Sequence, residues 1–277
     1  MAIRSNRMWT RFAALAGAAV FAASANAQVV SLFDGNAEAV FDPDSSAGHR
    51  DWFVNGTDHM FQQWFWIRAG NDPSERSIDS LVKFTQQVTD TNTVEDPRPD
   101  TLSLGYREPG AARYEVYGTF TLRGGAPGQT LSDIMEVLTI RNISNAPLTF
   151  SFFQYADFDI NGTASGDSGQ ILFGRIPQQW EGNAFATEAI ETPAPNRWQI
   201  DTFPAIISSL NDAGITNLNN SSGPIGPGDL SWALQWDFTL APGQEFIISK
   251  DKMIVPAPGA LGLLALAGVA GMRRRRG

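Results

Sequence analysis

The stretch LSWALQWDFTL, residues 230–240, decides the fold class. Apolar side chains occupy every second position along it, with mostly polar side chains between them. The apolar series is Leu230, Trp232, Leu234, Trp236, Phe238 and Leu240. Successive side chains of a β-strand point to opposite faces of the sheet, so this pattern predicts a strand with one buried and one wet face. Such half-buried strands are typical of antiparallel sheets.

The same alternation recurs over residues 114–123, and further β-rich runs cover 133–142, 148–160 and 245–255. Short Gly-, Pro- and Asn-rich segments separate these runs and predict tight turns. Helical character is confined to residues 205–210, and no alternation of strands with helices suggests a parallel sheet. We therefore predict an all-β fold, a large antiparallel β-sandwich of roughly ten to fourteen strands, with jelly-roll and extended-sandwich topologies both open.

The first 27 residues have the composition of a secretory signal peptide. Three arginines precede an apolar stretch of small residues, and Ala25 and Ala27 supply the small side chains that a signal peptidase reads. Cleavage is expected before Gln28. The apolar stretch is short for a membrane span, which needs about 20 residues.

The last 23 residues, 255–277, divide into three parts. A Pro-x-Pro motif is followed by an uncharged segment, residues 259–272, and then by a basic cluster. The motif is Val255, Pro256, Ala257 and Pro258, and the cluster is Arg273, Arg274, Arg275 and Arg276. An apolar segment followed by arginines keeps its basic end in the cytoplasm. A plain membrane anchor is one interpretation of this tail.

The three-part tail resembles the PEP-CTERM sorting signal of bacterial exported proteins, although Ala257 stands where that motif usually has Glu. The resemblance implies recognition by an exosortase-like membrane protease and delivery to the cell surface or the extracellular matrix. It also implies an association with exopolysaccharide and biofilm. It covers only the tail, so the expected organisation is a signal peptide (1–27), one β-sandwich domain (28–254) and a sorting tail (255–277).

Composition narrows the function of the central domain. The two ends carry seven Arg and no acid, so the domain has 13 basic against 29 acidic side chains, a net charge of −16. Such a surface disfavours nucleic acid, whose binding depends on neutralised phosphates. The chain has no Cys, which excludes disulfides, thiolate chemistry and Cys-based metal sites. Membrane contact is expected only through the tail.

The segment QYADFDINGTASGD, residues 154–167, resembles the start of a calcium loop. Asp157, Asp159 and Asn161 alternate before Gly162, and Asp167 follows. Calcium takes six to eight oxygen ligands, and this spacing offers several. Ser168 stands where an EF-hand loop has its Glu, so an EF-hand is excluded. The remaining alternatives are an open calcium site at a strand end, formed by these four residues, and an acidic turn. No other cofactor is expected.

Evidence for an enzyme is weak in the sequence. Asp157 and Asp159 fall on one face of a strand, and paired carboxylates can hydrolyse glycosides. Acidic pairs on a wet face are common, however, and the chain has neither a nucleophile elbow nor a phosphate loop. The expectation is that the protein has no catalytic residues.

Tryptophans provide a second hint of sugar binding. Trp64 and Trp66 lie in a run that is apolar on both faces, which predicts a central strand with both faces buried. Trp180 and Trp198 have polar neighbours and are the candidates for stacking on sugar rings. The sequence thus predicts an exported surface or matrix protein with a structural or adhesive role. The alternatives are a carbohydrate-binding module, with or without calcium, and a polysaccharide-active enzyme.

Overall fold

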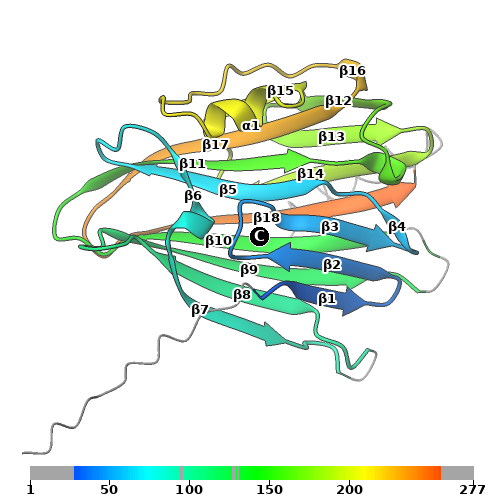
Figure 1. Ribbon diagram of the computed structural model, residues 1–277, viewed down its shortest axis with the longest axis horizontal. Coiled ribbons are helices and arrows are strands. Elements are labelled where there is room, and N and C mark those ends of the chain that lie inside the picture. The colour runs from blue at the N-terminus through cyan, green and yellow to red at the C-terminus, as the bar shows by residue number, and fades with distance from the viewer. Residues whose placement is uncertain (1–27, 94–95, 127–128, 130, 257–277) are drawn as a thin grey trace, which may run out of the picture.

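The computed structural model describes residues 28–93, 96–126, 129 and 131–256. Two large sheets, almost entirely antiparallel, pack face to face around one hydrophobic core (Figure 1). This confirms the all-β class and the sandwich. The signal peptide, Ala257, Pro258 and the arginine cluster lie outside the described residues.

The first sheet, here called sheet A, has its strands in the order β1-β2-β3-β5-β11-β17-β15, with β4 beside β3 and β6 beside β5. Between the described strands of this sheet, the short pairing of β3 with β5 is the only parallel one. The strands are β1 (Val30–Asp34), β2 (Ala37–Asp42), β3 (Gly48–Val54), β4 (Thr57–Asp58), β5 (Gln62–Ala69), β6 (Arg76–Ser77), β11 (Leu148–Asp157), β15 (Arg197–Thr202) and β17 (Leu230–Leu240).

The second sheet, sheet B, runs in the order β16-β12-β13-β14-β18-β10-β9-β8-β7. Its strands are β7 (Val82–Thr89), β8 (Thr101–Arg107), β9 (Tyr114–Gly124), β10 (Ser132–Asn142), β12 (Asp167–Leu172), β13 (Ile176–Glu181), β14 (Ala184–Thr192), β16 (Ile225–Gly228) and β18 (Glu245–Pro256). The described residues thus form more strands than the ten to fourteen expected. The excess comes partly from β4, β6 and β16, which have two to four residues and are too short to show alternation.

Strand β5 lies between β3 and β11, and both of its faces are covered. Trp64, Phe65, Trp66 and Ile67 are all fully buried, as the double-sided apolar run predicts. Phe61, just before this run, is half exposed because it precedes the first paired residue of β5.

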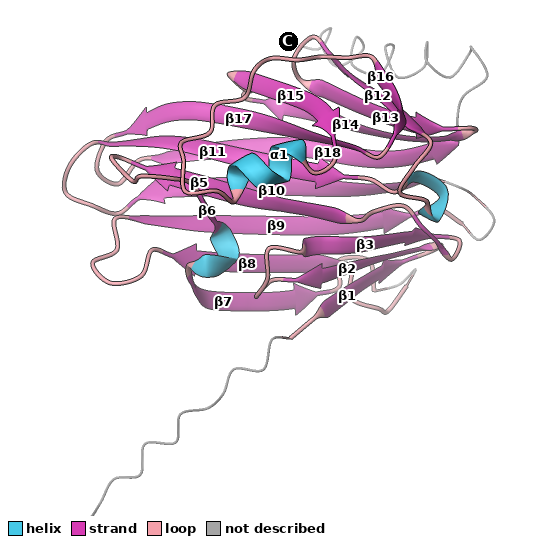
Figure 2. Ribbon diagram, turned by 45° about the horizontal axis from the view of Figure 1, so that its top comes forward, coloured by secondary structure: helices cyan, strands magenta, loops and turns pink. Residues whose placement is uncertain are grey.

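Three short helices join the strands: α1 (Ala205–Leu210) and the 3-10 helices η1 (Ile78–Ser80) and η2 (Ile160–Gly162). Helix α1 coincides with the one helical segment expected and lies over the outer face of sheet A (Figure 2). The indole of Trp66, which points to that face, donates a hydrogen bond to Asn211 just after α1. None of the helices in the described ranges is long and apolar enough to cross a membrane.

The space between the sheets contains a group of charged side chains, here called the interior ion cluster. Sheet B contributes Glu136, Glu188, Lys250 and Lys252, none more than 1 % exposed. The Nζ atoms of Lys250 and Lys252 each lie 2.5 Å from a carboxylate oxygen of Glu136, and Lys250 is 3.4 Å from Glu188. The side-chain amides of Gln63 and Gln154 in sheet A complete the cluster through hydrogen bonds to these four charged side chains.

Strand β7 forms one edge of sheet B and is the longest of the four edge strands, with eight residues. Val82, Phe84 and Val88 on it are between 41 and 53 % exposed. The pairing of β7 with β8 shifts register between Lys83 and Thr85. The amino group of Lys83 lies 2.6 Å from a carboxylate oxygen of Asp44.

Gly48 begins β3 at a φ of +57°, and a Cβ atom there would lie 2.1 Å from Cε3 of the buried Trp64 ring. We expect Gly48→Ala to lower the free energy of unfolding by about 1–3 kcal/mol more than Gly56→Ala does. Gly56 also has a positive φ, +80°, but open space around it. Gly56→Ala therefore measures the cost of placing alanine at a positive φ without any steric clash. Urea denaturation of both variants measures the difference, and equal losses would contradict the close packing of Gly48.

Candidate functional site

The candidate site begins where β11 ends. Asp157, its last residue, lies opposite Gln62 of β5 and Ser231 of β17 on the outer face of sheet A. Its side chain is 1 % exposed, and Oδ2 accepts a hydrogen bond of 2.8 Å from the hydroxyl of Tyr155. The other oxygen, Oδ1, has no hydrogen-bond partner among the described residues. A buried carboxyl oxygen left unpaired is costly and calls for an explanation.

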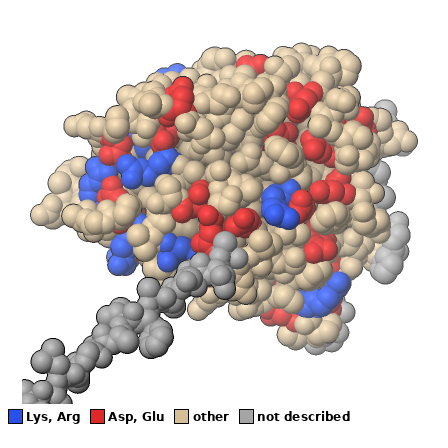
Figure 3. Space-filling view, viewed as in Figure 1, with Lys and Arg blue, Asp and Glu red and all other residues tan. Residues whose placement is uncertain are grey.

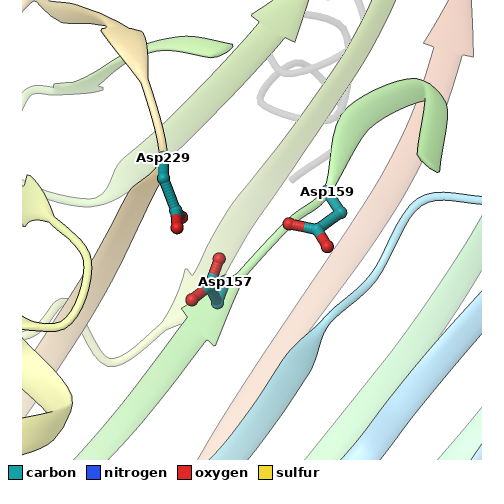
Figure 4. Close-up of side chains that lie close together, drawn as sticks. All are labelled: Asp157, Asp159 and Asp229. Carbon is teal, nitrogen blue, oxygen red and sulfur yellow. The ribbon is translucent and has the colours of Figure 1, made fainter. Parts of the chain in front are cut away.

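Two more carboxylates approach Asp157. Asp159 comes from the segment after β11, and Asp229 from the residue before β17 (Figure 4). One oxygen from each of the three lies within 4.8 Å of the others. These three residues are here called the Asp triad. The antiparallel pairing of β11 with β17 causes the convergence, because it places the end of one strand beside the start of the other.

The structure brings together Asp157 and Asp159 but not the other two residues of the expected calcium loop. Asn161 has a φ of +63° within η2, and its side-chain amide bonds to Glu181 instead. Asp167 begins β12, and its Oδ2 accepts a hydrogen bond from Gln179 at 2.5 Å. Of the four expected residues, Asp157 and Asp159 belong to the triad, and its third member, Asp229, was not foreseen.

Burial and mutual repulsion raise the pKa values of the triad. The pKa of Asp157 rises to about 8, first because of burial and then because Asp229, Asp159 and Asp167 lie near. Burial also raises the pKa of Asp159, with the charges of Asp229 and Asp58 adding to it, and burial raises the pKa of Asp229. None of the three forms an ion pair with a basic side chain in the described part of the chain.

An open pocket of about 470 Å³ lies beside the triad and shares Asp159 with it. The β2–β3 turn, β3, β4 and the start of β5 form its walls. Three of its lining residues are acids, Asp51, Asp58 and Asp159. Oδ1 of Asp58 is held by the backbone N–H groups of Trp52 and Met60, and burial raises the pKa of its carboxyl group. The pocket was not foreseen, because nothing in the sequence places residues 45–62 beside residue 159.

An aromatic side chain borders the same pocket. The ring of Phe61 is 50 % exposed and meets the edge of Phe203, with ring centroids 5.9 Å apart. Trp180 and Trp198, the sugar-stacking candidates, are only partly exposed. The indole of Trp198 donates a hydrogen bond of 2.8 Å to Ser222 and packs against Gly174. Phe61 is therefore the better-placed aromatic side chain for a ligand in this pocket.

Acidic side chains dominate parts of the surface seen in Figure 3, with the basic ones in a few groups between them. In the pocket itself, Arg50 is the one basic lining residue, and its Nε lies 2.9 Å from Asp51. A ligand of this pocket therefore meets hydrogen-bond acceptors and negative charge, which suits hydroxyl groups or a cation better than an anion.

The expected sorting motif overlaps the last strand. Val255 pairs with Phe185, and Pro256 with Ala184, at the end of the β14–β18 ladder. The sandwich therefore extends two residues beyond the boundary expected at 254. Of the signal-peptidase site, only Gln28 falls within the described residues, and Ala25 and Ala27 do not.

No family model and no curated protein matches the sequence. Solved structures do resemble the fold. A bacterial glucoamylase complexed with acarbose has a TM-score of 0.55 and 7 % identity, over 86 % of this chain and 35 % of its own. A putative aldose 1-epimerase from Escherichia coli K12 has a TM-score of 0.48 and 9 % identity, over 82 % of this chain and 98 % of its own.

A galactose mutarotase-like protein from Lactobacillus casei has a TM-score of 0.45 and 7 % identity, over 82 % of this chain and 100 % of its own. The chain spans about a third of the glucoamylase. The sandwich thus resembles part of the glucoamylase in fold. This likeness corrects two predictions from sequence, the structural or adhesive role and the absence of enzymatic activity. The alternation of residues predicts a sandwich but does not distinguish one sandwich family from another.

Proposed function

We propose that the protein is a carbohydrate-active enzyme that binds a sugar in the pocket beside the Asp triad. One observation carries the proposal: Asp51, Asp58 and Asp159 line a single open pocket next to the exposed ring of Phe61. The resemblance of the fold to a glucoamylase supports it. Export through residues 1–27 and sorting through the tail stay predictions, and they would place this activity at the cell surface or outside the cell.

The pocket has the groups that sugar chemistry requires. Carboxylates accept hydrogen bonds from sugar hydroxyls, and an aromatic ring offers an apolar face to the C–H side of a pyranose. Reactions at the anomeric carbon need one group that donates a proton to an oxygen and one that removes a proton from water or a hydroxyl. Asp58 and Asp159 come from different segments of the chain and line the same pocket, so they are the pair we assign to these roles.

The test uses the full-length chain and a panel of α- and β-linked oligosaccharides, with release of reducing ends as the readout. Polarimetry of a free aldose measures anomer interconversion in parallel. We expect Asp58→Asn and Asp159→Asn each to lower the rate by about 10²–10⁴-fold, the usual contribution of a general acid or base. Asn at position 58 keeps the Oδ1 acceptor for Trp52 and Met60, so the local fold is preserved.

Asp212→Asn is the matched control, because Asp212 is exposed and lies outside both the pocket and the triad. It removes the same charge and should leave the rate unchanged. Full activity in both pocket variants would refute the assignment of Asp58 and Asp159. Sugar binding without turnover on any substrate would refute the enzyme and leave a carbohydrate-binding module.

A further inference from the structure

Within the described part of the chain, no basic side chain balances the charge of the Asp triad. Three carboxylates from separate parts of the chain lie with one oxygen each within 4.8 Å, and no ion pair of the described residues involves them. Like charges this close repel, so the arrangement requires protons or a bound cation. An acidic cluster alone does not decide between these two, and the neighbouring side chains have to be considered.

Two buried oxygens beside the triad accept no hydrogen bond from any described residue. Oδ1 of Asp157 is one, and the hydroxyl of Ser231, which lies beside that of Tyr155, is the other. Ser231 is fully buried and lies directly opposite Asp157 in the β11–β17 ladder, so the two side chains stand on the same face of sheet A. Buried polar atoms in folded proteins almost always have a partner, and oxygens can gain one by binding a cation. Ser231 is therefore an independent sign that a ligand belongs at this position.

We propose that Asp157, Asp159 and Asp229, with the hydroxyl of Ser231, bind a calcium ion. All the donors are oxygen atoms, which selects a hard cation and disfavours zinc and copper. Asp159 and Asp229 are partly exposed, so water can complete a coordination shell of about six to eight oxygens. Calcium tolerates such irregular, partly hydrated sites better than magnesium, which demands a near-ideal octahedron.

The proposal is tested with the full-length chain, freed of metal by a chelator and titrated with calcium chloride in a calorimeter. We expect one calcium ion to bind per chain. A calcium concentration of a hundred times Kd should raise the melting temperature by roughly 5–10 °C, since the ion binds only the folded state. Magnesium at the same concentration should produce a smaller shift.

Variants separate this site from the loop expected from sequence. Asp229→Asn and Ser231→Ala should each weaken calcium binding at least tenfold, whereas Asn161→Gly and Asp212→Asn should leave it unchanged. Glycine at position 161 suits the positive φ there. Without calcium, Asp229→Asn should melt no lower than the parent, because it relieves repulsion. A purely structural role for Asp229 would predict the opposite.

Two outcomes would overturn the proposal. One is a parent protein with neither binding heat nor a melting shift at millimolar calcium, which would mean that protons alone neutralise the triad. The other is an Asp229→Asn variant that binds calcium as tightly as the parent. Asp159 belongs to both proposals, but the calcium test uses no sugar and its variants are at Asp229 and Ser231, which do not line the pocket, so the two proposals can fail separately.

Discussion

Replacing Glu136 by Gln should lower the free energy of unfolding by about 3–5 kcal/mol, the usual cost of removing one partner from a buried ion pair. Glu136 receives both Lys250 and Lys252 at 2.5 Å, and the three side chains are at most 1 % exposed. The attraction of the two ammonium groups lowers the pKa of Glu136 against the opposing effect of burial. A neutral amide cannot balance both ammonium groups, so at least one buried charge loses its counter-ion.

The same ladder supplies the control. Arg141 and Glu245 form an ion pair across β10 and β18 at 3.6 Å, but both are about 45 % exposed. Glu245→Gln should cost less than about 1 kcal/mol, as exposed pairs do. Guanidinium denaturation of both variants gives the comparison. Equal losses would mean that the interior ion cluster is no more important than a surface pair.

A second substitution shows whether the cost comes from the unbalanced lysine. Lys252→Met in the Glu136→Gln background should destabilise much less than Lys252→Met in the parent, because it removes the charge left without a partner. Independent, additive losses from the two substitutions would contradict this account.

The buried ring of His49 should by itself make the folded protein less stable in acid. Its ring is fully buried and stacks on Phe41 with centroids 4.5 Å apart. Burial and, after it, the charge of Lys252 lower the pKa of His49 from 6.5 to about 3, against the raising effects of Glu136, Gln63 and Asp51. Between pH 6.5 and about pH 3, His49 binds a proton in the unfolded chain but not in the folded chain.

The contribution of His49 to the free energy of unfolding therefore falls as the pH drops from 6.5 towards 3. At pH 4 the loss from this one ring is on the order of 3 kcal/mol relative to pH 7.5. Asp157 and Asp167 act in the opposite direction, because burial raises their pKa values to about 8 and about 7, so their contribution is lost as the pH rises. A comparison with a variant is needed to isolate His49.

His49→Phe keeps the stacked ring and cannot be protonated. Its stability relative to the parent should increase by about 3 kcal/mol between pH 7.5 and pH 4, since Asp157 and Asp167 titrate equally in both proteins. Urea denaturation at intervals of half a pH unit measures the difference. A difference that stays constant with pH would mean that His49 does not titrate differently in the folded and unfolded chains.

Alternation along residues 230–240 predicted the strand correctly, because the period of two is a local property of the chain. The expected wet face was wrong for residues 230–236, which are buried on both faces. The buried faces of β5 followed from the apolar residues on both of its sides. The interior ion cluster could not be predicted in the same way. Lys250 and Lys252 share the alternate positions of Ile248 and Ile254, but their charge predicts exposure, and only the structure shows that they are buried.

The sequence predicted only part of the candidate site. Asp157 and Asp159 are two residues apart, so their proximity follows from local spacing. Asp229 lies 70 residues later in the chain and joins them through the register of β11 with β17, which no local pattern specifies. The acids of the pocket, Asp51 and Asp58, were missed for the same reason. The sequence therefore identified the segment of the site but not its complete set of residues.

Strand β7 has a consequence for how the protein behaves at high concentration. A long edge strand with exposed apolar side chains can pair with the edge of another molecule and begin aggregation. The register shift between Lys83 and Thr85 works against this, because a bulge twists the edge and interrupts a continuous row of backbone groups. The charge of Lys83 beside Asp44 adds a second barrier. These two features protect against edge-to-edge aggregation, and losing them together would turn the most exposed edge of sheet B into a template for fibrous growth.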